Sequence, residues 1–203
     1  EEKEAPVFTL GNEEPFVSPN TYSEQSLMYN YKRYPKDNEF LNYYFNLPLL
    51  KKFIFELRDR KEPPRILDLG SGAGIESKIL GDQIPGSVII STDLSKQGAH
   101  YGKELFKLEQ IQSDASQSPF KKESFDAIHC KDLLVHIPDK AVFLKDVSRI
   151  LSPGGLFLLV SSERVYTDYA QFEWTQEEIE KIANENGLKL IASEKQEMEK
   201  DDW

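Results

Sequence analysis

A short apolar run leads directly into three glycines at alternate positions, in the segment ILDLGSGAG from Ile66 to Gly74. Glycine has no Cβ atom, so it lets the chain turn sharply and lets a ligand lie against bare main chain. A helix that starts after such a turn offers unpaired N–H groups to the ligand. The segment therefore predicts a strand, a ligand-binding turn and a helix. The alternative is a plain, tight strand-to-helix turn.

Short apolar runs alternate with helical patterns along the chain after Pro63 and Pro64. The predicted strands are 65–69, 87–92, 109–112, 125–130 and 156–160, with a weaker one at 188–192. The predicted helices are 75–82, 96–107, 139–151 and 176–186. Continuous apolar strands separated by helices are typical of a parallel sheet that is covered on both faces. The pattern therefore predicts an α/β domain.

The first 62 residues lack this alternation. Residues 1–20 are acidic, rich in proline and without an apolar period, so we expect an extended arm. Tyrosines are frequent from residue 21 onward, a helix is predicted from Asn38 to Phe45, and Pro48 starts a second, amphipathic helix. We therefore expect residues 21–62 to form an N-terminal helical cap and residues 63–203 to form the ligand-binding domain.

Composition limits the kinds of partner. The 203 residues suit one main core, and 25 Lys+Arg against 35 Asp+Glu give a formal net charge of −10, which disfavours nucleic acid. The single cysteine allows neither an internal disulfide nor a zinc cluster, which favours a cytoplasmic location and no metal. No apolar run approaches the roughly 20 residues that span a bilayer. The sequence begins with Glu rather than Met, which is consistent with a trimmed start, and it does not predict an oligomeric state.

The glycine spacing distinguishes two classes of nucleotide ligand. Dinucleotide-binding folds use GxGxxG, whereas this chain has GxGxG. Asp93 closes the second predicted strand, where its carboxylate can accept hydrogen bonds from both hydroxyls of a ribose. NAD sites and S-adenosylmethionine sites share that feature, so it indicates a ribosyl ligand without choosing between them. The alternative for Asp93 is the N-cap of the following helix.

The motifs taken in order resemble those of the class I S-adenosylmethionine-dependent methyltransferases, from about Arg65 to Ala192. They are ILDLGSGAG, STDLS, QSDAS, FDAIHCKDLLVHIPD and LSPGGLFLL. The resemblance implies a Rossmann-like, doubly wound, mostly parallel sheet with seven strands. It also implies S-adenosylmethionine as cofactor, S-adenosylhomocysteine as product and a small-molecule methyl acceptor. The family's seventh, antiparallel strand has no counterpart before Trp203, so either it is absent or the sequence is shortened.

The resemblance also implies a set of cofactor contacts. The glycine loop would lie beneath the methionine and ribose, Asp68 would orient that loop and the amino group of the cofactor, and Asp93 would hold the ribose hydroxyls. Asp114 and the Ala115 amide would read the adenine edge, unless Asp114 only closes an Asx turn. The cofactor-binding residues are thus Asp68, Gly70, Ser71, Gly72, Asp93, Leu94, Asp114, Ala115, Cys130 and Lys131. The last two would contribute main-chain contacts, and we expect the Cys130 thiol to be buried and inert.

Methyl transfer to oxygen or nitrogen needs an aligned nucleophile and a group that removes its proton. His136, in LLVHIPD after the fourth strand of the domain, is the predicted base; its alternative is to cap the next helix. Asp132, in the same loop, is expected to bind a cationic substrate or to orient His136. Tyr29, in the tyrosine cluster, is the third predicted catalytic residue, with packing as its alternative. We expect His129 to be structural.

Other functions remain open at this point. A protein or RNA methyltransferase would share every cofactor residue, although the acidic composition argues against RNA. A non-catalytic S-adenosylmethionine-binding partner protein would keep the glycine loop and lack acceptor chemistry. A nicotinamide dehydrogenase fits the glycine spacing least well.

Overall fold

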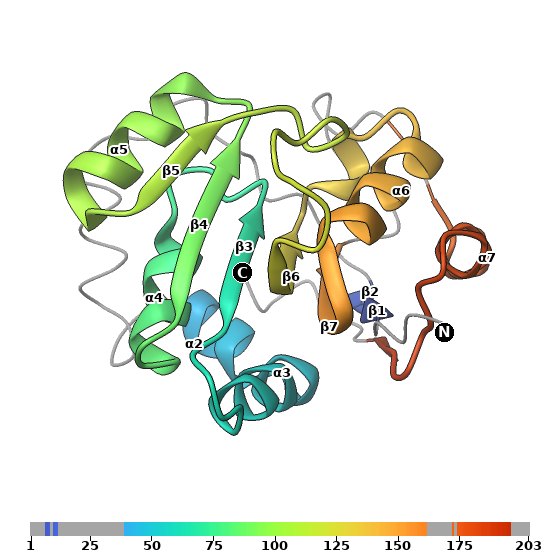
Figure 1. Ribbon diagram of the computed structural model, residues 1–203, viewed down its shortest axis with the longest axis horizontal. Helices are drawn as coiled ribbons and strands as arrows, with labels where there is room; N and C mark the ends of the chain where they lie inside the picture. The colour runs from blue at the N-terminus through green and yellow to red at the C-terminus, as the bar shows by residue number, and fades with distance from the viewer. Residues whose placement is uncertain (1–6, 9, 12–38, 162–171, 173, 196–203) are drawn as a thin grey trace.

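A six-stranded parallel sheet forms the centre of the protein, with the strands in the order β1-β7-β6-β3-β4-β5 (Figure 1). The computed structural model describes residues 7–8, 10–11, 39–161, 172 and 174–195. The strands are β1 Val7–Phe8, β3 Arg65–Leu69, β4 Val88–Asp93, β5 Glu109–Gln112, β6 Phe125–Lys131 and β7 Leu151–Val160. The predicted Rossmann-like α/β architecture is confirmed.

The order of the strands reverses at β3. The chain moves outward from β3 to β4 and β5, and then returns to place β6 on the other side of β3. In open α/β sheets, ligands bind outside the carboxyl ends of the strands at such a switch point. The crevice of this protein is therefore expected where β3 and β6 end, which is where the glycine loop and the HIPD stretch begin.

Helices cover both faces of the sheet (Figure 1). They are α2 Glu39–Asn46, α3 Pro48–Arg58, α4 Ile75–Gln83, α5 Lys96–Phe106, the single 3₁₀ turn η1 Leu134–His136, α6 Lys140–Ile150 and α7 Gln176–Glu185. Helices α6 and α7 pack over one core, and α2, α3 and α4 pack over the other. Successive strand residues alternate between the cores, as Ile66 and Leu67 do in β3.

Three helices begin at side chains that accept a hydrogen bond from the first turn. Thr175 Oγ1 accepts from the Glu178 amide at 3.2 Å, which confirms the start predicted for α7. Asp139 Oδ1 accepts from the Val142 amide at 3.0 Å, so Asp139, and not His136, caps α6. The N-cap of α5 is Ser95 rather than Asp93. Neither Asp93 nor His136 is therefore an N-cap, which was the alternative role for each of them.

The strand predicted at 188–192 is wrong. The structure has a short strand β8, Glu194–Lys195, which pairs with β2, Leu10–Gly11, in a separate two-stranded sheet. The outer edge of β7 is occupied by β1, so the segment after α7 finds no partner in the main sheet. Leu188 is buried against the core beneath α7, which explains its apolar character without a strand. The two paired stretches of the N-terminal arm are extended, and the rest of the arm lies outside the described residues.

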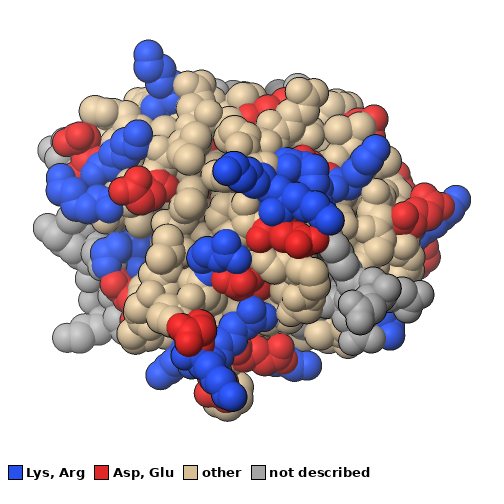
Figure 2. Space-filling model, viewed as in Figure 1, with Lys and Arg blue, Asp and Glu red and all other residues tan. Residues whose placement is uncertain are grey.

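Charges of both signs are spread over the face drawn in Figure 2, where Lys and Arg side chains lie next to Asp and Glu. Within the described residues, no helix is both long and apolar enough to cross a bilayer. The same part of the chain contains no group of three or more His, Cys, Asp or Glu side chains placed to hold a metal ion.

Candidate active site

The glycine loop joins the end of β3 to the start of α4 and is tied to the end of β4. The amides of Gly70 and Ser71 both donate to the Thr92 carbonyl, at 2.8 and 2.9 Å. Gly70 has φ +78°, in the left-handed region, and a Cβ atom there would come within 2.9 Å of the Leu133 side chain. The loop can hold this shape only with glycine at position 70, because both the backbone conformation and the space exclude a side chain.

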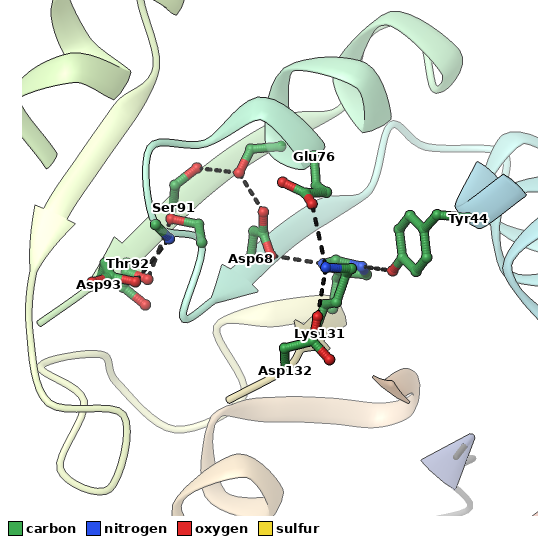
Figure 3. A network of polar contacts seen from close by, with 12 residues as sticks. Tyr44, Asp68, Glu76, Ser91, Thr92, Asp93, Lys131 and Asp132 are labelled. Atoms are coloured by element: carbon green, nitrogen blue, oxygen red, sulfur yellow. Dashed lines mark hydrogen bonds and ion pairs between the residues drawn. The ribbon is translucent and has the colours of Figure 1, made fainter. Parts of the chain in front are cut away.

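The half-buried Asp93 lies at the end of β4 and faces the glycine loop. Its Oδ2 accepts from the Gly72 amide at 2.7 Å, and its Oδ1 accepts from the Ser95 amide at 2.7 Å. The carboxylate therefore reaches the loop from the neighbouring strand, and its predicted contact with ribose hydroxyls stays a prediction. Figure 3 shows Asp93 and Thr92 next to the loop that follows β3.

Gln110, in β5, supports the loop from below and was missed by the sequence analysis. The residue is 1% exposed. Its Nε2 donates to the Gly72 carbonyl at 2.6 Å and to Ser71 Oγ at 3.2 Å. Nothing in the polar strand sequence EQIQ distinguishes it from its neighbours, because its partners come from a segment almost forty positions earlier. Only the tertiary structure reveals this support.

The ends of β4 and β5 lie together beside the loop. The Ser113 amide donates to the Asp93 carbonyl at 3.0 Å, and Gln112 Nε2 donates to the Leu94 carbonyl at 2.9 Å. Leu94 is 70% exposed, and its predicted contact with the cofactor stays a prediction. Asp114 Oδ1 accepts from the Ser116 amide at 2.8 Å, so the Asx turn is formed. The predicted contacts of Asp114 and Ala115 with adenine remain predictions.

The end of β6 contributes the other half of the crevice. Asp132 has φ +54°, an uncommon conformation for a residue other than glycine. It turns the chain from β6 toward η1, and its amide donates to the Val160 carbonyl at 2.8 Å. Asp132 Oδ2 accepts from Lys131 Nζ at 2.6 Å, and Lys131 Nζ lies 3.7 Å from Glu76 Oε1. The described contacts thus join Asp132 to Lys131 rather than to His136.

His136 is exposed on η1, beyond the end of β6. An exposed imidazole on the crevice side of the sheet is accessible to an acceptor, which is compatible with the predicted base. Cys130 is fully buried, and burial raises the pKa of its thiol well above the ordinary value, with the carboxylates of Asp68 and Asp132 adding to the rise. The predicted burial of Cys130 is confirmed, and a buried thiol with a raised pKa is poorly reactive in general. Tyr29 lies outside the described residues.

Asp68 is buried and is occupied on both carboxylate oxygens. Its Oδ1 lies 2.7 Å from His129 Nδ1, and its Oδ2 accepts from the Ser77 hydroxyl (Figure 3). These contacts favour the part of its predicted role that orients the glycine loop. The predicted contact of Asp68 with the amino group of the cofactor stays a prediction. His129 is buried in β6, as expected for a structural residue, and His100 is exposed on α5.

Comparison with known proteins agrees with this geometry. Residues 67–159 match the family model of the methyltransferase domain. The chain is 29% identical over 131 residues to the ubiquinone/menaquinone biosynthesis C-methyltransferase UbiE of Vibrio campbellii, covering 59% of this chain and 49% of the relative. It is 28% identical over 114 residues to the ubiquinone biosynthesis O-methyltransferase of Aliivibrio fischeri, covering 53% and 48%. The chain thus spans about half the length of these curated relatives.

Solved structures show the same fold. A candidate sarcosine dimethylglycine methyltransferase from Galdieria sulphuraria superposes with a TM-score of 0.61 at 17% identity, over 70% of this chain and 60% of that one. Residues 67–159, which match the methyltransferase domain, contain the glycine loop, Asp93 and the end of β6. These are the parts at the expected ligand-binding edge of the sheet. The chain thus contains a methyltransferase domain at residues 67–159, within a Rossmann-like fold of the kind that class I S-adenosylmethionine-dependent methyltransferases have.

Proposed function

We propose that this protein transfers a methyl group from S-adenosylmethionine to an oxygen or nitrogen atom of a small molecule. The observation that carries the proposal is the placement of the glycine loop and Asp93 together at the switch point of the sheet. The C- and O-methyltransferases among the relatives support a small acceptor. The mixed charges in Figure 2 and the net charge of −10 disfavour a nucleic-acid substrate.

The residues at the crevice suit such a cofactor. Gly70 leaves the main chain bare, and Asp93 provides a carboxylate at the height of the loop. Thr92 Oγ1 and Ser113 Oγ, at the ends of β4 and β5, are buried without a hydrogen-bond partner among the described residues. Buried polar atoms normally find partners, so unsatisfied ones beside a ligand crevice are consistent with a polar ligand there.

The proposed mechanism divides the work between the two halves of the crevice. S-adenosylmethionine supplies an electrophilic methyl group on a sulfonium that leaves readily. The glycine loop, Asp93, Leu94 and Asp114 bind and orient the cofactor, and the main chain at Cys130 and Lys131 positions its methionyl part. His136 removes the proton of the acceptor, and Asp132 with Lys131 forms the charged wall at the end of β6. Tyr29 stays a proposed contributor from the N-terminal cap.

Binding of S-adenosylhomocysteine is the first test. We expect it to raise the melting temperature, because a ligand that binds only the folded state stabilises it by about 2.7 kcal/mol at one hundred times its Kd. Thermal melting and calorimetric titration measure the effect, with NAD as the control ligand. No shift at millimolar S-adenosylhomocysteine, or an equal shift with NAD, would overturn the proposed cofactor.

Replacing Asp93 with alanine is expected to weaken S-adenosylhomocysteine binding by about 1–3 kcal/mol, the range for hydrogen bonds to charged groups. The carboxylate is lost both to the ribose and to the Gly72 amide. Calorimetric titration of the folded variant measures the change. Asp82→Ala is the matched control, because Asp82 is an exposed carboxylate on α4 and its loss should leave affinity unchanged. Equal affinity in the Asp93 variant and the unaltered protein would remove Asp93 from the site.

A screen of acceptors tests the catalytic half of the proposal. Hydroxylated aromatic compounds and small amines are incubated with S-adenosylmethionine, and S-adenosylhomocysteine formation is measured. Turnover with one class identifies the acceptor atom. Tight cofactor binding without turnover on any acceptor would instead favour a non-catalytic partner protein.

A further inference from the structure

A continuous chain of buried polar side chains crosses the core behind the crevice, and the mechanism above does not use most of it. Tyr44 Oη contacts His129 Nε2, His129 Nδ1 lies 2.7 Å from Asp68 Oδ1, and the Ser77 hydroxyl donates to Asp68 Oδ2. Ser91 Oγ donates to Ser77 Oγ at 2.7 Å. Each of these five residues is at most 3% exposed, and they come from α2, β6, β3, α4 and β4 (Figure 3).

The Asp68 carboxylate sets the direction of the hydrogen bonds at the centre of the network. A carboxylate only accepts, so His129 donates to Asp68 from Nδ1 and Ser77 donates from its hydroxyl. With its proton on Nδ1, the imidazole can accept from the Tyr44 hydroxyl at Nε2. Burial raises the pKa of Tyr44 well above its ordinary value, and the nearby carboxylates of Glu76, Asp68 and Asp132 raise it further, so the phenol keeps its proton.

The network holds both ends of the glycine loop. Asp68 lies in β3, two positions before Gly70, and Ser77 lies in the first turns of α4, after the loop. Tyr44 belongs to a different part of the chain, the helix α2 on the same face of the sheet. The imidazole of His129 is the only group in the described network that contacts both Tyr44 and Asp68.

The Tyr44 end of the network lies beside Lys131 and Asp132, the charged side chains at the end of β6. The Lys131 ammonium lies 5.5 Å from the centre of the Tyr44 ring, and the same ammonium contacts Asp132 and Glu76. A shift of α2 would therefore move the ring beneath Lys131 as well as the hydroxyl that holds His129. Apolar side chains of similar volume could fill such a core as stably. What the polar network adds is a fixed mutual position of α2, β6 and the loop.

We propose that His129 is a positioning residue of the methyl-donor site. Through Asp68, His129 couples the position of helix α2 to the shape of the glycine loop. The identification of the loop as a donor site rests on the proposed function. The coupling itself concerns only this chain's own contacts. It makes a hydroxyl on α2 affect the binding of a ligand that the hydroxyl does not touch.

The test combines a cycle of variants with two measurements. Tyr44→Phe removes one hydroxyl, His129→Leu removes the link, and His129→Gln keeps a donor for Asp68 and an acceptor for Tyr44. Amide hydrogen exchange at Gly70 and Ser71 reports the loop without any ligand, because both amides are protected by the Thr92 carbonyl. Calorimetric titration with S-adenosylhomocysteine reports the site. Ser148→Ala is the control, since it removes a buried hydroxyl from α6, which packs on the opposite face of the sheet.

We expect Tyr44→Phe to weaken S-adenosylhomocysteine binding by about 2–150-fold, the range for coupled neighbours, and to speed exchange of the two loop amides. His129→Leu should do at least as much, and adding Tyr44→Phe to it should cause no further loss. His129→Gln should restore most of the affinity, and Ser148→Ala should change neither measurement. Fully additive effects of the first two variants, or unchanged loop exchange in folded Tyr44→Phe, would overturn the proposal.

The proposal stays testable if these variants fail to fold or if the proposed cofactor fails to bind. Nitrogen NMR of the unaltered protein should find a proton on His129 Nδ1, the nitrogen that faces Asp68, and the ring signals should shift when S-adenosylhomocysteine is added. A proton on Nε2, or no shift with bound ligand, would overturn the positioning role. If the unaltered protein binds no S-adenosylhomocysteine, the proposed function fails, and loop exchange in the variants still decides the coupling.

Discussion

Replacing His136 with alanine is expected to lower turnover by about 10²–10⁴-fold, the usual contribution of a general base. His136 is exposed on η1 at the carboxyl end of β6, and Asp139, not His136, caps the following helix. The loss of the imidazole should therefore remove a proton acceptor without removing a structural contact. S-adenosylhomocysteine affinity and the melting temperature should stay close to those of the unaltered protein.

The rate profile gives a second measurement for the same variant. A general base must be unprotonated to accept a proton, so the activity of the unaltered enzyme should fall at acid pH and this limb should vanish without His136. His100→Ala, an exposed histidine on α5, is the matched control and should keep the full rate and the limb. The acceptor must be one whose proton leaves during transfer, such as a hydroxyl. Near-normal turnover with an unchanged limb would eliminate His136 as the base and turn attention to Tyr29.

Replacing Gly98 with alanine is expected to lower the free energy of unfolding by about 1–3 kcal/mol, the cost of overpacking a filled site. Gly98 lies in the first turn of α5, and a Cβ atom there would lie 2.5 Å from the Gly72 carbonyl oxygen and 2.9 Å from its carbon. These are backbone atoms of the glycine loop, so the loop must move. Because the Gly72 amide also binds Asp93, S-adenosylhomocysteine affinity should fall together with stability.

Gly81→Ala is the matched control for that variant and should raise the free energy of unfolding rather than lower it. Gly81 lies inside α4, and the nearest atom to its added Cβ would be Ile89 Cδ1 at an ordinary 3.5 Å. Alanine is favoured over glycine in a helix by roughly 0.5–1 kcal/mol, so this variant should gain stability and keep its affinity. Denaturant unfolding and calorimetric titration measure both variants. If Gly98→Ala had the same free energy of unfolding and the same S-adenosylhomocysteine affinity as Gly81→Ala, this would contradict the close packing of α5 on the loop.

Local patterns were enough to predict the strands β3 to β7 and most of the helices, and to propose the segments of the donor site. The run from Ile66 to Gly74 encodes its own strand and turn, and Asp93 ends a strand whose apolar period is visible in the sequence. Such features depend on neighbours a few positions apart, and the period of side chains along a strand or helix carries that information. The predicted strand at 188–192 failed because a strand also needs a free edge, and β1 occupies the one beside β7.

The supports of the site depended on the tertiary structure. In the sequence, His129 is one more residue of an apolar strand. Only the strand register, which pairs His129 with Asp68, shows that the two side chains share a face of the sheet. Tyr44 lies 85 positions from His129, and Gln110 lies 38 positions from Gly72. Partners at such separations are fixed by how strands and helices pack together. The sequence by itself determined which segments surround the crevice, and the packing of distant segments decided which side chains hold them in place, because periodicity specifies a face and not the neighbour across it.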